Sequence, residues 1–195
     1  MNVSRTSTQG LATSLLISML LLILPALSAA RDSGAQNNQE NPQVTQLLSQ
    51  ARDKAAVLSR DADEMEALTR SDVSWQSHAS MLETMKEDVN DLARITEKLE
   101  ASSDSASQWQ RQAIDRMMPL LKELASNTTA AINHLKQEPN RPTSGEYAEY
   151  LRQNSETARE LSDMISSFVQ YGQTRAKLER LEEKLEIGSG KRASR

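Results

Sequence analysis

Residues 75–99 decide the fold, and they read WQSHASMLETMKEDVNDLARITEKL. Apolar or bulky side chains recur in this stretch at alternating intervals of three and four residues, at Trp75, His78, Leu82, Met85, Val89, Leu92, Thr96 and Leu99. This spacing places them on one face of a helix that packs lengthwise against other helices. The stretch therefore predicts a long amphipathic helix in an all-α fold.

Three other stretches repeat this spacing, so the chain predicts four helices, at about 44–69, 74–101, 105–137 and 144–187. Segments rich in Ser and Asp, at 71–74 and 102–105, separate the first three and supply helix caps. A Pro- and Gly-containing segment, 138–145, precedes the fourth. Short connections favour antiparallel neighbours. Residues 44–187 therefore predict an antiparallel up-down-up-down four-helix bundle with an overlong fourth helix.

Pairing the four apolar faces about their connections predicts the layers of the core. One predicted layer contains Leu68, Trp75, Ala131 and Leu151, and another contains Ala51, Leu92, Ile114 and Phe168. Near one end, Gly172 falls opposite Trp109. A glycine inside a helix costs about 1 kcal/mol relative to alanine. We therefore expect Gly172 to provide room for the indole, with a hinge as the alternative.

One layer breaks the apolar rule, and it contains Met65, His78, Thr128 and Asn154. Buried polar side chains must pair, because an unpaired one costs about 1–3 kcal/mol. The donors and acceptors of His78, Thr128 and Asn154 are complementary. The sequence therefore favours a structural network that fixes the register of the helices. The other histidine, His134, is expected on the surface.

The alternative for this layer is a ligand site, in which His78 and Met65 bind haem iron or another metal. In bundle plan alone, the chain resembles the secreted four-helix cytochromes of the haem-b and c′ types. The Cys-x-x-Cys-His attachment motif of the c′ type is absent, since the chain has no cysteine. We find no residue-level match to the b type. The favoured interpretation assigns no cofactor and no metal.

The end of the fourth predicted helix outruns its partners, so that residues 178–187 are expected to project. Leu178, Leu181 and Leu185 continue an apolar face there, among Lys177, Glu179, Arg180, Glu182, Glu183 and Lys184. An apolar stripe with charged flanks is typical of helices that pair. The sequence therefore offers self-association through this segment, with a solvated helix end as the alternative.

The N-terminus predicts a secretory signal peptide over residues 1–30. Arg5 precedes an apolar run at 11–24, and Pro25 is followed by small residues. The run is shorter than the roughly 20 apolar residues that span a bilayer. We expect cleavage between Ala26 and Arg31, with an uncleaved anchor as the alternative. Residues 31–43 are predicted to form a flexible polar leader, and residues 188–195 a flexible basic tail.

Composition excludes several classes of function. Without cysteine there are no disulfides, thiolate metal sites or thiol nucleophiles. A formal net charge of −4 argues against nucleic acid as a partner, because phosphate binding needs a basic face. Phosphate-binding loops and hydrolase or metalloprotease motifs are missing. The sequence therefore predicts a secreted or periplasmic structural or protein-interaction module, not an enzyme, whose partner is an unknown protein or a second copy.

Overall fold

The computed structural model describes residues 40–139 and 145–192, with side chains described to residue 185. The predicted signal peptide and residues 31–39 of the predicted leader lie outside these ranges. Within them, the secondary structure comprises α1 (Pro42–Leu68), α2 (Trp75–Ala101), a short 3₁₀ helix η1 (Ser103–Ser105), α3 (Gln108–Gln137) and α4 (Gly145–Arg192). None of these helices is long and apolar enough to cross a membrane.

Polar side chains fix where the first three long helices begin. The Asn41 side chain accepts from the backbone N–H groups of Gln43 and Val44, directly before Pro42. Ser74 accepts from the N–H of Ser77 at the start of α2. At the start of α3, Gln110 Oε1 accepts from the Ser107 N–H at 2.9 Å. These contacts satisfy backbone donors that a helix start otherwise leaves unpaired.

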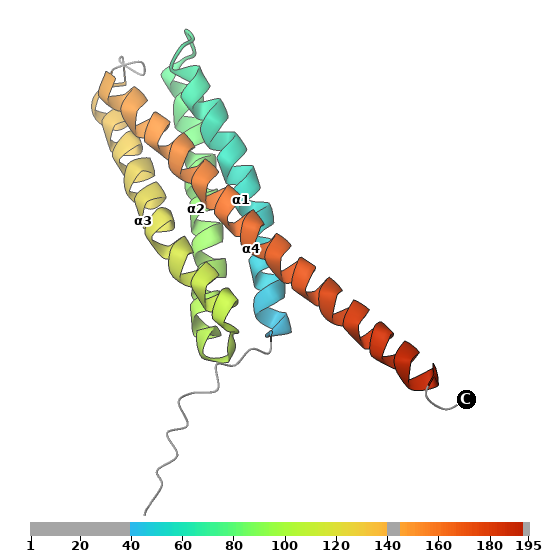
Figure 1. The fold of residues 1–195 in the computed structure, drawn as a ribbon. Coiled ribbons are helices and arrows are strands. Elements are labelled where there is room, and N and C mark those ends of the chain that lie inside the picture. Colours follow the sequence, from blue (N-terminus) through green and yellow to red (C-terminus); the bar gives the residue numbers. More distant parts are fainter. Residues whose placement is uncertain (1–39, 140–144, 193–195) are drawn as a thin grey trace, which may run out of the picture. The chain divides into compact units, whose positions relative to one another are not determined.

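The four long helices pack as a closed ring, in which α1 and α3 each contact both α2 and α4 (Figure 1). The start of α1 lies beside the start of α3, where the Asn41 N–H donates to Gln110. The start of α2 lies beside the start of α4, where His78 meets Tyr147. The fold of the described residues is therefore an all-α four-helix bundle, as predicted.

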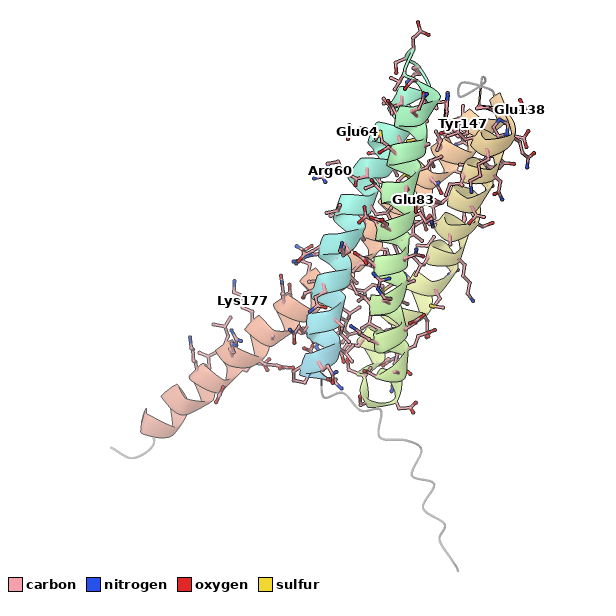
Figure 2. All side chains as sticks on the ribbon, turned by 180° about the vertical axis from the view of Figure 1, so that it is seen from behind. Arg60, Glu64, Glu83, Glu138, Tyr147 and Lys177 are labelled. Atoms are coloured by element: carbon pink, nitrogen blue, oxygen red, sulfur yellow. The ribbon has the colours of Figure 1, made fainter. Side chains whose placement is uncertain are left out.

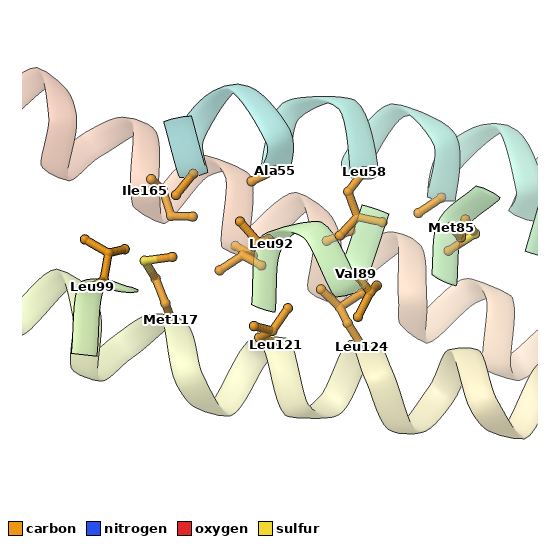
Figure 3. Close-up of a cluster of buried hydrophobic side chains, with 14 of the residues drawn as sticks. Ala55, Leu58, Met85, Val89, Leu92, Leu99, Met117, Leu121, Leu124 and Ile165 are labelled. Atoms are coloured by element: carbon orange, nitrogen blue, oxygen red, sulfur yellow. The ribbon is translucent and has the colours of Figure 1, made fainter. Parts of the chain in front are cut away.

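The core runs the length of the bundle and combines large with small apolar side chains from all four helices (Figure 3). Leu58, Met85, Leu124 and Ile165 are each at most 1% exposed. Leu82 through Leu99 of α2 are buried at every predicted position. Burial of one such leucine contributes about 1.5–3 kcal/mol, so this alternating face is the main source of stability.

Three predicted core positions are not fully buried, and the first, Leu68 at the end of α1, is half-buried against the core. Trp75, the first residue of α2, is 43% exposed, and its indole lines a surface groove between α2 and α3 instead of entering the core. Phe168 is only half-buried, and Val169 is buried in its place. The buried positions of α4 here follow a spacing of four residues, so the predicted step of three after Ile165 selects the wrong neighbour.

The long fourth helix continues to Arg192, past the predicted end at residue 187. Residues 188–192, which we expected in a flexible tail, are therefore helical. Helix propensity does not account for this continuation, because Gly188 and Gly190 are poor helix formers. As Figure 1 shows, α4 extends well beyond the other three helices.

Candidate functional site

The four residues of the predicted polar layer are all buried. Met65, His78 and Asn154 are 0% exposed and Thr128 is 2% exposed. The Asn154 Nδ2 group donates to Thr128 Oγ1 at 3.2 Å, which joins α3 to α4 as expected. His78 is not part of that pair, because its Nδ1 atom lies 3.2 Å from the hydroxyl of Tyr147. The polar layer is therefore two separate contacts rather than one network of three.

Tyr147 is the residue that the sequence analysis missed as a partner for His78. It is 0% exposed, and its ring packs edge-on against the imidazole at 5.5 Å. Figure 2 labels it near the start of α4. Burial lowers the pKa of His78 and raises the pKa of Tyr147, so both groups are held in their neutral forms at neutral pH. The sequence could have indicated this contact, because Tyr147 lies on the predicted buried face of the fourth helix.

His134 also contacts Tyr147, so the prediction of a surface histidine is wrong. Its side chain is only 11% exposed and stacks on the Tyr147 ring at 5.8 Å. Its Nδ1 atom lies 4.0 Å from the carboxylate of Glu146. The second turn of α4 adds Tyr150, whose hydroxyl donates to Glu146. Both histidines of the chain thus pack against the ring of Tyr147, which shields them from solvent.

The contacts of the polar layer favour a structural role over a ligand site. His78 Nε2 and Asn154 Oδ1 have no hydrogen-bond partner among the described residues, and a free Nε2 is an atom that could bind a metal. Against this, the adjacent core residues Leu82, Leu124 and Ala158 are at most 1% exposed. Within the described ranges, no three or more His, Asp or Glu side chains cluster as metal ligands.

At the opposite end of the bundle, a second polar contact is fully paired. The buried Gln110 side chain donates through Nε2 to the Asn41 carbonyl and to Thr45 Oγ1, both at 2.9 Å. Its Oε1 accepts from the N–H groups of Asn41 and Ser107. Both N–H donors and both acceptor positions of the Gln110 side-chain amide are therefore used to join the starts of α1 and α3, and the amide has none left for a ligand.

Gly172 provides space for Trp109, as predicted. A Cβ atom at position 172 would lie 2.7 Å from two carbon atoms of the Trp109 ring. The indole is 5% exposed, and its Nε1 donates to Glu40 Oε1 at 3.0 Å. The edge of the same indole meets Tyr171 at 5.8 Å. The packing interpretation therefore accounts for this glycine without a hinge.

Among the surface grooves of the described residues, two have large aromatic side chains in their lining. The first has a volume of about 330 Å³ between α2 and α3 and is lined by Trp75, Ala79, Ile132 and Leu135 among others. The second has a volume of about 780 Å³ between α3 and α4, and its apolar lining is Trp109, Met164, Phe168 and Tyr171. Neither groove is lined by His78 or Met65, so neither leads to the polar layer.

The projecting part of α4 carries the most exposed apolar side chains. Leu178 is 55% exposed, Leu181 47% and Leu185 73%, and Tyr171 is 50% exposed. We define the outer stripe as Met164, Tyr171, Leu178, Leu181 and Leu185. Lys177, labelled in Figure 2, lies beside this stripe on the segment that extends from the bundle.

The outer stripe is not the continuation of the core face that we expected. The core face of α4 comprises Ala158, Leu161, Ile165, Val169 and Gly172. With 3.6 residues per turn, the centre of the outer stripe lies roughly 150° around the helix from that face. Positions that would extend the core face are Ala176, Glu179 and Glu183. The helix thus has two apolar faces: the bundle buries the first, and it partly covers the second at Met164 and leaves it exposed from Tyr171 onward.

Comparison with known proteins adds no assignment, since no protein-family model, curated protein or solved structure matches this chain.

Proposed function

We propose that this chain is an exported helical-bundle module that acts by binding another protein surface through the outer stripe of α4, without catalysis. The signal-peptide pattern of residues 1–30 supports the exported part of this proposal, with the periplasm or the outside of the cell as the destination. The bundle supports α4, and the projecting segment, with its leucines, is the part that a partner contacts.

The observation that carries this proposal is the exposure of Leu178, Leu181 and Leu185 on a face that the bundle leaves uncovered. Single exposed leucines are common on protein surfaces, but a contiguous apolar stripe with charged flanks marks an interaction site. Full burial of each leucine by a partner would contribute about 1.5–3 kcal/mol. Burial of the exposed parts of three leucines on one face therefore favours a complex, against the cost of lost translational and rotational freedom on association.

The alternative of a haem or metal carrier that uses His78 and Met65 has one observation in its favour, the unpaired Nε2 of His78. The contact between His78 and Tyr147 and the filled neighbouring layers argue against it. The two histidines and the buried amide therefore serve the fold in this proposal.

Substitution of the three leucines by serine tests the proposal. We expect the Leu178→Ser, Leu181→Ser, Leu185→Ser variant to keep the helicity and melting temperature of the parent chain, because the bundle does not bury these side chains. Chemical crosslinking in the expressing cells should then show the loss of adducts that the parent chain forms, with another protein or with itself. A Trp75→Ser variant, which removes an exposed apolar side chain elsewhere, should keep them. Adducts that survive in the triple variant would contradict the proposal.

A further inference from the structure

The outer stripe of α4 has the repeat of a coiled coil. Met164, Tyr171, Leu178 and Leu185 are spaced seven residues apart, and Leu181 occupies the intermediate position of the repeat. The equivalent intermediate positions earlier in the helix are Ser167 and Thr174, whose small side chains allow another helix to approach. A seven-residue apolar repeat keeps its stripe facing one partner helix over successive turns. The stripe is therefore built to receive a helix.

The groove between α3 and α4 lies on the same face as the outer stripe and lengthens it. Met164 and Tyr171 line this groove together with Phe168, and Trp109 and Arg116 form its wall on α3. The Arg116 guanidinium lies over the Phe168 ring, 5.9 Å from its centroid. A helix along the stripe would thus contact the groove first and the exposed leucines beyond it. This extends the docking surface to three heptads, where the projecting leucines alone give one and a half.

The charges beside the stripe identify the occupant. In a parallel pair of identical helices, the residue before each first apolar position faces the residue five positions later on the partner. Lys177 then faces Glu182 of the second copy, and the symmetry of the pair produces this contact twice. An antiparallel pair that aligns Leu178 with Leu181 instead places Lys177 opposite Lys184 and Glu182 opposite Arg175, so that its repulsive contacts offset its attractive ones. The flanking charges therefore complement a parallel second copy.

We propose that two copies of this chain associate through a parallel coiled coil of their α4 helices, with Lys177 of each copy paired to Glu182 of the other. This inference rests on the proposed function, because it assigns the partner of the same outer stripe. The helix that binds the outer stripe is thus the α4 helix of a second copy, which has the same repeat and the same flanking charges.

Sedimentation equilibrium of the purified, processed chain tests the association. We expect a mass that rises with concentration to twice that of one chain. The Leu178→Ser, Leu185→Ser variant should sediment as a single chain throughout. The matched control, Glu179→Ser with Glu183→Ser, changes two residues on the opposite face of the same segment and should associate like the parent. A parent chain that stays monomeric up to about 100 μM, a concentration at which weak complexes assemble, would overturn the inference.

Charge reversal tests the parallel register. Lys177→Glu and Glu182→Lys should each weaken self-association about tenfold, because two attractive pairs become repulsive. A mixture of the two variants should recover the parent affinity, since each restored pair joins opposite charges between the two variants. Glu183→Lys, which makes the same change on the opposite face, should have no effect. Stronger association of Lys177→Glu would overturn the parallel arrangement, because only an antiparallel pair gains from opposing Lys184.

The outcomes separate this inference from the proposed function. A monomeric chain whose crosslinks to a different protein depend on the outer stripe would overturn the inference and keep the function. A chain with no stripe-dependent contact to any protein would overturn both.

Discussion

At the scale of single residues, Gly172 shows how one position can contradict a local propensity for the sake of packing. Alanine would favour the helix by about 1 kcal/mol. Here its Cβ would meet the Trp109 ring at 2.7 Å. The indole is held by its hydrogen bond to Glu40 and by its edge contact with Tyr171, so it has little freedom to move. Steric exclusion therefore outweighs the gain in helix propensity.

We expect Gly172→Leu to lower the free energy of unfolding by about 1–3 kcal/mol through overpacking. Gly172→Ala should cost less, because a single methyl group demands a smaller shift of the ring. Urea unfolding of both variants measures these effects. In a Trp109→Leu background the smaller side chain opens the site, so Gly172→Ala should become neutral or stabilising. A higher melting temperature for Gly172→Leu in the parent background would show that the two residues do not face each other.

The buried imidazole of His78 makes stability depend on pH. Burial lowers its pKa in the folded chain below the ordinary value of 6.5, so protonation favours the unfolded chain. The stabilisation of the neutral form is complete above the unfolded pKa and is lost as the pH falls below 6.5 toward the folded value. The pH range in which His78 affects stability therefore lies below 6.5.

We expect the free energy of unfolding to fall as the pH drops below 6.5, with a slope of at most about 1.4 kcal/mol per pH unit. Chemical denaturation across this range measures the slope. A His78→Gln variant should be less stable at neutral pH but should lose this dependence. His134→Gln is the matched control, because it removes the other histidine and should keep the slope. If His78→Gln leaves the slope unchanged, the buried imidazole is not its source.

At the scale of the elements, the sequence predicted the helices and their buried faces well, because a continuous spacing of three and four leaves one choice of face. All positions from Leu82 to Leu99 of α2 are buried as expected. The predictions failed where that spacing is ambiguous. Phe168 and Val169 are adjacent apolar residues, and only the tertiary contacts of α4 decide which one the core receives.

The ends of elements were harder to predict for a related reason. Trp75 is the first residue of α2, and its indole lines a surface groove instead of entering the core. His134 looked like a surface residue because its position lies beside the predicted apolar face. Its burial depends on the rings of Tyr147 and Tyr150, which the separate helix patterns do not relate to α3. Contacts between helix ends require the assembled bundle.

The overlong α4 was predicted, but its second face was not. We treated Leu178, Leu181 and Leu185 as an extension of the core face because they share its spacing. The count along the helix shows that they belong instead to the repeat that begins at Met164. The two repeats overlap between residues 164 and 172, where the bundle buries one face of α4 and covers the other only in part, at Met164.

At the scale of the whole molecule, stability and interaction are assigned to different faces of the same helix. The ring of four helices buries one face of α4, and the polar contacts of Gln110 and His78 link helix starts at its two ends. Variants of the projecting leucines should therefore separate binding from folding. We therefore expect binding to depend on the outer stripe of α4 and folding on its buried face.

Site-specific photocrosslinking along α4 in the expressing cells tests that expectation most directly. A photoreactive amino acid is placed singly at Leu178, Leu181 and Leu185 of the outer stripe, and at Arg180 and Glu183 of the opposite face. We expect protein adducts at the three stripe positions, to a second copy or to another protein, and none at the two opposite positions. Equal adducts on both faces, or adducts at Arg180 and Glu183 alone, would contradict it.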